Sequence, residues 1–298
     1  MLVRVGKNSF GLALGSGGLR GAAHIGVLKS LERHGLRPAY LSGSSAGAVV
    51  AALYAAGYTV DELASLATNL DASKIYDSSI TWRSVFSLGA SLLCALLPGK
   101  SPLPLALPEG LIKGAAWEGY LTSLLGTSKF SDLKLPTAIL SVDINTGDTV
   151  AFAAEHLPAA DVTLIGATVV EAVRASSSIP GVFQPLHLYG YTLVDGAVKA
   201  SVPTRLTYAL GADVVVAVDL GYAGQREDAV DNIVEIMSQS LHILGEELTE
   251  CQLQDSAELV VRPRIYDVSL RDFERIPEII ERGERAMVAQ IPLLLQLL

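Results

Sequence analysis

Short apolar runs alternate with amphipathic stretches along most of the chain, and these two patterns predict strands and helices respectively. The apolar runs predict strands at Phe10–Leu14, Ala39–Ser42, Thr137–Val142, Asp148–Ala153, Tyr191–Val194, Val214–Val218 and Leu259–Arg262. The amphipathic stretches predict helices at about Arg20–His34, Ala46–Ala56, Asp61–Asn69, Ala115–Leu125, Val169–Ser176, Val202–Leu210, 228–250 and 272–294. The strands on either side of Asn145–Gly147 are expected to pair as a hairpin. The alternation is typical of an α/β fold, so we expect three layers, α/β/α, around a mainly parallel central sheet.

Residues 80 to 110 interrupt this alternation of strand and helix patterns. Aliphatic residues there are interspersed with Pro98, Pro102, Pro104 and Pro108. We interpret the stretch as a flap or lid between two helical regions. Because no convincing linker divides the chain, we expect residues 1–298 to form one domain that carries this insertion.

Charge and composition narrow the classes of function. The 298 residues are 50% hydrophobic and carry a formal net charge of -9. Such an acidic chain repels a phosphate backbone, so nucleic acid is not an expected partner. Neither Cys94 nor Cys251 lies in a C-x-x-C pair, and we expect both to be reduced and buried. The N-terminus has no signal-peptide pattern, and the longest apolar stretch, Val85–Leu97, is too short to span a bilayer, so we expect a cytoplasmic location.

The segment Gly43-Ser44-Ser45-Ala46-Gly47 matches the pattern G-x-S-x-G. The pentapeptide alone fits a tight packing turn equally well. Its context, directly after a predicted strand and before a predicted helix, is the one that a nucleophile elbow requires. Glycines at 43 and 47 avoid a clash where the chain passes close to itself, and the helix start places a positive dipole end beside the Ser45 hydroxyl.

A glycine-rich loop, Gly15–Gly21, follows the first predicted strand. It fails the dinucleotide-binding fingerprint, because the third glycine position of that pattern falls on Arg20, and it also lacks the Gly-Lys-Ser/Thr of a P-loop. Backbone amides at Gly17 and Gly18, near a helix start, would suit a developing oxyanion. Arg20 could fix the loop or meet an anionic head group, and both alternatives remain open.

The base that would activate Ser45 is not obvious. Of the five histidines, only His242 is late enough in the chain for the α/β-hydrolase order, and it lies mid-helix between apolar neighbours. His24 follows the glycine loop, but a structural role is favoured for it. Asp195 lies at the end of a predicted strand and before Gly196. In open parallel sheets, active sites are found at the carboxyl ends of the strands, so Asp195 could accept the Ser45 proton directly. Partial desolvation would raise its pKa and make it a better base, whereas the alternative is that Asp195 only caps a turn.

Together, these segments resemble the patatin-like phospholipase family in its bacterial single-domain form. The segments that carry the resemblance are Gly15–Gly21 with the following Ala22–Leu28, Gly43–Gly47, Ala175–Pro185 and Asp195–Ala197. They occur in the family's order across roughly residues 10 to 220, a joint pattern far more specific than any single motif. One departure is Ser16, which stands where many relatives have a glycine.

The resemblance implies a Ser–Asp dyad in which Ser45 is the nucleophile and Asp195 the base, with oxyanion-hole amides from Gly17 and Gly18. It implies no catalytic histidine, metal or cofactor. The implied reaction is the hydrolysis of fatty acyl esters, including phospholipids and lysophospholipids, so a lipid or acyl ester is the expected partner.

Two other functions stay open: an acyltransferase that uses the same dyad, and a non-catalytic regulatory protein that keeps the fold. The 80–110 flap could line an acyl-chain pocket or meet a membrane surface, or it could be a buried excursion or an oligomer contact. The leucine-rich C-terminus could likewise pack on the body of the protein, contact a partner chain or contact lipid. A peripheral membrane contact and a homo-oligomer are therefore both open.

Overall fold

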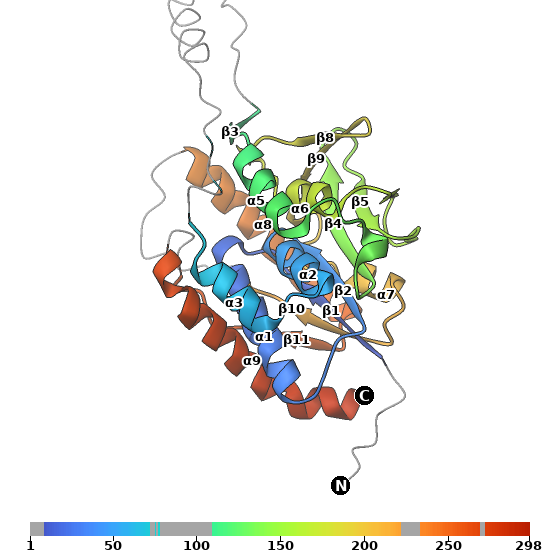
Figure 1. The fold of residues 1–298 in the computed structure, drawn as a ribbon, viewed down its shortest axis with the longest axis vertical. Helices are drawn as coiled ribbons and strands as arrows, with labels where there is room; N and C mark the ends of the chain where they lie inside the picture. Colours follow the sequence, from blue (N-terminus) through green and yellow to red (C-terminus); the bar gives the residue numbers. More distant parts are fainter. Residues whose placement is uncertain (1–8, 72–74, 76, 78–108, 222–232, 269–271) are drawn as a thin grey trace, which may run out of the picture.

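A mixed, mainly parallel β-sheet forms the centre of the fold (Figure 1). The structure is a computed structural model that describes residues 9–71, 75, 77, 109–221, 233–268 and 272–298. Nearly all of the flap expected at 80–110, including Cys94, lies outside these residues. The strands of the central sheet are β1 (Phe10–Leu14), β2 (Tyr40–Ser44), β4 (Thr137–Asp143), β5 (Thr149–Ala153), β6 (Val162–Ile165), β8 (Leu186–Leu188), β9 (Tyr191–Asp195), β10 (Val214–Val218) and β11 (Leu259–Val261).

The strand order confirms the parallel core of the sheet. Strands β11, β10, β1, β2 and β4 lie side by side in that order and are parallel. Strand β5 then pairs antiparallel with β4 as the hairpin predicted around Asn145–Gly147, with Val142 opposite Thr149, and β6 pairs parallel with β5. Strand β9 pairs antiparallel with both β4 and β8.

Helices cover both faces of the sheet, which confirms the predicted three layers (Figure 1). The core on one face is completed by α1 (Ala22–Arg33), α2 (Ala46–Ala56), α3 (Val60–Thr68), α5 (Ala115–Leu125), α6 (Val169–Ser176) and α9 (Ile276–Leu297). On the other face lie α7 (Thr204–Ala209) and α8 (Ile233–Ser256). In β1, Leu12 and Leu14 face the first group of helices and Ala13 faces the second, because side chains alternate along a strand.

Two glycines allow α1 and α9 to pack at backbone contact. A Cβ atom on Gly26 of α1 would lie 1.9 Å from the carbonyl oxygen of Ile280, and one on Gly283 of α9 would lie 2.1 Å from that of Ala23. Since α1 begins directly after the glycine-rich loop, α9 supports the helix on which that loop ends.

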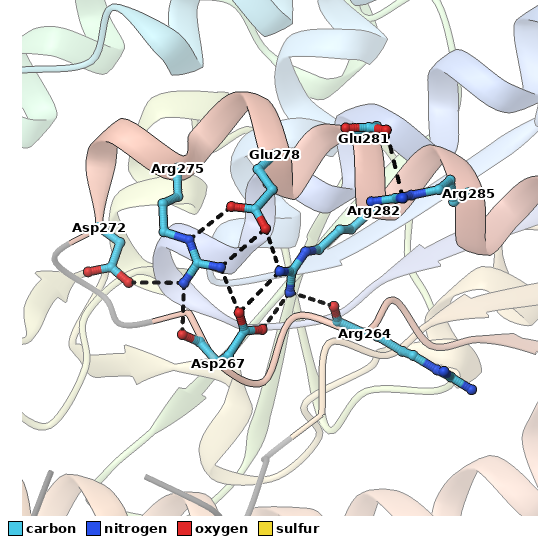
Figure 2. Close-up of polar contacts among 8 residues, drawn as sticks. All are labelled: Arg264, Asp267, Asp272, Arg275, Glu278, Glu281, Arg282 and Arg285. Atoms are coloured by element: carbon cyan, nitrogen blue, oxygen red, sulfur yellow. Dashed lines mark hydrogen bonds and ion pairs between the residues drawn. The ribbon is translucent and has the colours of Figure 1, made fainter. Parts of the chain in front are cut away.

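A network of charged side chains joins the first turns of α9 to the segment after β11 (Figure 2). Asp267 bonds both Arg275 and Arg282, and Glu278 bonds the same two arginines. Asp272 forms a further ion pair with Arg275. Hydrogen bonds from Arg282 and Arg275 hold the pKa of Asp267 well below its usual range. The network therefore fixes the start of α9 while the charges stay ionised.

Several features differ from the sequence-based expectations. The first helix begins as a 3₁₀ turn, η1 (Gly18–Gly21), and becomes α-helical only at Ala22. Strands β3 (Gly110–Ile112), β7 (Gly181–Phe183), β6 and β8, each three or four residues long, were not predicted. Cys251 is exposed, so the expectation that it is buried was wrong. Cys251 lies on the solvent-facing side of α8, whereas the opposite side of the helix packs on the sheet through residues such as Leu253.

Candidate active site

Ser45 lies at the sharp turn between β2 and α2, as a nucleophile elbow requires. Its backbone has φ 53° and ψ −119°, and a residue with a side chain rarely adopts such a positive φ. The turn is crowded: a Cβ on Gly47 would lie 2.1 Å from the carbonyl oxygen of Leu14, and one on Gly43 would lie 2.5 Å from that of Gly47. Only glycine fits at both positions, because any side chain would clash with the backbone that passes beside it.

Strand β9 brings Asp195 to Ser45 by way of β4. On one edge of β4, β2 pairs with the first half, and its last residue, Ser44, lies opposite Leu140. On the same edge, β9 pairs with the second half, and Asp195 lies opposite Ser141. Because Leu140 and Ser141 are adjacent, the ends of β2 and β9 meet head-on. The expected reason, a shared carboxyl edge of parallel strands, was therefore wrong, since β9 is antiparallel.

The Asp195 carboxylate is buried and hydrogen-bonded to Ser45. The side chain of Ser45 donates to it, and Oδ1 also accepts the amide of Ala197 at 2.9 Å. Asp195 is 3% exposed, and this burial raises its pKa to about 6 despite the two hydrogen bonds, which act in the opposite direction. Such a carboxylate is ionised near neutral pH and is a stronger base than an ordinary aspartate.

The glycine-rich loop lies against the elbow. A Cβ on Gly21 would lie 2.5 Å from the Cβ of Ala46, and one on Gly47 would lie 2.7 Å from the carbonyl oxygen of Gly15. Gly18 has a positive φ of 55°. Within the described part of the chain, the amides of Gly17 and Gly18 have no backbone acceptor, so they can donate to a bound group.

The exit of β10 supports this loop. The amide of Gly15 donates to the carbonyl of Val218 at 3.0 Å, and Nη1 of Arg20 donates to the carbonyl of Gly221 at 3.2 Å. The Arg20 contact favours the loop-fixing alternative of the two that the sequence left open.

The histidines do not supply a base among the contacts that the structure describes. His24 is fully buried, its Nε2 donates to the carbonyl of Gly15 at 2.8 Å, and burial lowers its pKa to about 4. His34 bonds the carbonyl of Ser30, and His187 bonds Glu109. The side chain of His242 lies outside the described residues. His24 thus has the structural role that the sequence favoured.

Two serines beside Ser45 and Asp195 were given no role by sequence reasoning. The Ser176 hydroxyl accepts the backbone amide of Ser45 at 2.8 Å, and the Ser178 carbonyl accepts the amide of Asp195 at 2.9 Å. Both lie in the segment Ala175–Pro185, which contributed to the family resemblance. The sequence carried this signal as a motif, but only the fold reveals which atoms it contacts.

The chain matches the patatin-like phospholipase family over residues 12–208, two thirds of its length, and it belongs to this family. An uncharacterized NTE family protein of Mycobacterium tuberculosis is 32% identical over 224 residues, which cover 74% of this chain and 52% of that protein. The lysophospholipase NTE1 of Scheffersomyces stipitis is 25% identical over 307 residues, which cover 95% of this chain and 18% of that enzyme. The chain thus spans about half, or less, of the length of these relatives.

Solved structures with a similar fold include VipD from Legionella pneumophila, with a TM-score of 0.48 and 14% identity, covering 98% of this chain and 67% of that one. Human GIVD cytosolic phospholipase A2 has a TM-score of 0.48 and 13% identity, covering 97% and 59%. Among the described helices of the present chain, none combines the length and apolarity needed to cross a bilayer.

Proposed function

We propose that this chain is a lipid acyl hydrolase that uses a Ser45–Asp195 dyad. The observation that carries the proposal is the hydrogen bond from the Ser45 hydroxyl to the buried Asp195 carboxylate, at a strained elbow in a chain of the patatin-like phospholipase family. A hydroxyl needs a base at hydrogen-bond distance to become a nucleophile.

In the proposed reaction, Asp195 takes the Ser45 proton while Oγ attacks the ester carbonyl carbon. The negative charge that develops on the carbonyl oxygen is stabilised by the amides of Gly17 and Gly18. The intermediate collapses, the ester C–O bond breaks, and the leaving alcohol takes the proton from Asp195. A water molecule then attacks the acyl-enzyme, again through Asp195, which releases the fatty acid and restores Ser45.

The proposed substrates are fatty acyl esters, including phospholipids and lysophospholipids. The family description and the name lysophospholipase in the yeast relatives support this class. The high pKa of Asp195, caused by its burial, supports its assignment as the base. In this mechanism Arg20 fixes the glycine-rich loop through Gly221 and does not act on the reacting atoms.

Labelling by a fluorophosphonate probe tests the proposal directly. Wild-type protein should be labelled at Ser45 and should hydrolyse a p-nitrophenyl acyl ester and lysophosphatidylcholine, whereas Ser45→Ala and Asp195→Asn should lose both activities. Ser177→Ala is the matched control, because its hydroxyl bonds the carbonyl of Val173 and not the dyad. A folded wild-type protein that remains unlabelled would refute the proposal. Acyl transfer to an added lysolipid in place of fatty acid release would point instead to an acyltransferase.

A further inference from the structure

The last residue of α6 and the segment directly after it contact both members of the dyad through their backbone amides. Ser176 contributes its hydroxyl oxygen to the amide of Ser45, and Ser178 contributes its carbonyl oxygen to the amide of Asp195. Both serines are fully buried. The end of α6 and the two residues after it therefore contact both the nucleophile and the base, which are 150 positions apart in the sequence.

The hydrogen bond from the Ser45 amide to the Ser176 hydroxyl involves a residue in a strained backbone conformation. Among the described contacts, the amide of Ser45 has no backbone acceptor, and the Ser176 hydroxyl accepts it at 2.8 Å. Loss of this acceptor leaves a buried N–H unsatisfied and gives the elbow a reason to relax toward an ordinary conformation. The position of Oγ relative to Asp195 would change with it.

The contact with Asp195 depends in turn on Arg174, one turn earlier in α6. Arg174 is 2% exposed, and its Nη1 donates to the Ser178 hydroxyl at 2.5 Å. Other donors of Arg174 bond the carbonyls of Gly114 at 3.2 Å, Lys113 at 2.8 Å and Gln184 at 2.9 Å. These carbonyls follow β3 and β7, so Arg174 ties the Ser178 turn to two neighbouring segments.

Burying the charged Arg174 side chain costs free energy. A buried guanidinium gives up its hydration, and here its hydrogen-bond acceptors are carbonyl and hydroxyl oxygens rather than a carboxylate. Burial lowers the pKa of Arg174, although the nearby charges of Glu118 and Asp77 act in the opposite direction. An apolar side chain at this position would leave the carbonyls of Lys113, Gly114 and Gln184 without this donor, so Arg174 fixes a geometry that such a side chain could not fix.

We propose that Arg174, Ser176 and Ser178 are positioning residues that align the dyad: Ser176 holds the elbow at Ser45, and Ser178, held by Arg174, fixes the backbone of Asp195. This inference rests on the proposed function for its effect on rate. Its structural content, that Ser176 restrains the elbow, holds independently of activity.

The decisive comparison is Ser176→Ala against Ser177→Ala. These neighbours at the end of α6 each lose one hydroxyl, but of the two only Ser176 bonds the dyad. We expect Ser176→Ala to lower kcat and the fluorophosphonate labelling rate by about tenfold or more, with KM little changed, since misplaced reacting atoms slow the chemical step. Ser177→Ala should stay within about twofold of wild type on the same reasoning. Equal rates for the two variants would overturn the proposal.

Hydrogen exchange separates this inference from the proposed function. The peptide that contains Ser45 should exchange faster in Ser176→Ala than in Ser177→Ala, whether or not the protein is active. If Ser176→Ala does not fold, Arg174→Lys and Ser178→Ala serve in its place, and the peptide that contains Asp195 is the one expected to exchange faster. Unchanged exchange at both peptides would overturn the inference, whereas altered exchange in a protein that no probe labels would overturn the proposed function alone.

Discussion

The conformation of Ser45 stores strain at a single residue. A positive φ of this kind costs a non-glycine residue about 1–3 kcal/mol, and the surrounding structure must supply that energy. At Ser45 the surroundings are the close approach of Gly47 to Leu14 and the hydrogen bond to Ser176. Under the proposed function, the hydroxyl of Ser45 is therefore held in place at the expense of stability.

Replacing Ser45 by two small residues measures this strain. Both Ser45→Ala and Ser45→Gly lack the hydroxyl, but only glycine adopts a positive φ without penalty. We expect Ser45→Gly to be more stable than Ser45→Ala by about 1–3 kcal/mol in urea unfolding. At Ser44, which lies in β2 with an ordinary φ, the order should reverse, because glycine weakens a strand. Glycine and alanine of equal stability at position 45 would contradict the assignment of strain.

The raised pKa of Asp195 predicts how activity depends on pH. Because the base must be ionised, kcat/KM should fall below the pKa of about 6, by about tenfold for each further pH unit. The measurement is a profile of ester hydrolysis from pH 4.5 to 8. His187→Gln should keep this acid limb, since His187 bonds Glu109 and not the dyad. An acid limb that disappears in this variant would assign it to the histidine instead.

The same titration affects stability with the opposite sign. Burial favours the neutral carboxyl in the folded state, so the stabilising effect of protonation is fully present below the unfolded pKa, near 3.8, and is lost as the pH rises through about 6. Asp195→Asn, which cannot ionise, should therefore be more stable than wild type at pH 8, by up to about 3 kcal/mol, and should lose this advantage near pH 4. If Asp195→Asn were less stable than wild type at pH 8, burial of the ionised Asp195 carboxylate would not destabilise the fold, which would contradict this prediction.

At the scale of elements, α1 and α9 pack in backbone contact at Gly26 and Gly283. Sequence patterns predicted both helices, because each has a clear apolar face. They did not predict this contact, since a helix period says which side is buried but not which helix lies against it. The short strands β3, β7 and β8 were missed for a related reason: their pairing is set by partners that are distant in the sequence.

A pair of helical glycines tests the contact between α1 and α9. Gly283→Ala places a Cβ against the carbonyl of Ala23, and we expect it to destabilise the fold by about 1–3 kcal/mol. A Cβ on Gly119 of α5 would meet nothing within 4 Å, so Gly119→Ala should be neutral or stabilising, by up to about 1 kcal/mol. Thermal unfolding of the two variants measures the difference. Equal melting temperatures would mean that α1 and α9 separate easily.

Across the whole molecule, the fold class and the residues of the candidate site could be predicted from the sequence, but their geometry could not. Ser45 was identifiable because an elbow depends on neighbours in the chain, which the pentapeptide records. The approach of Asp195 depends on the register of β4, whose edge is divided between β2 and β9. No local pattern encodes that division, so reasoning from parallel strands expected Asp195 beside Ser45 for a reason that the antiparallel β9 does not support.

The shared edge of β4 also governs when the chain can become reactive. Asp195 lies 150 positions after Ser45. A polypeptide leaving the ribosome can fold its elbow long before β9 has been synthesised, and until β9 docks, the serine has no carboxylate beside it. Under the proposed function, the nascent protein would be inactive toward lipids until β9 has been synthesised, and the docking of β9 against β4 would itself complete the catalytic pair.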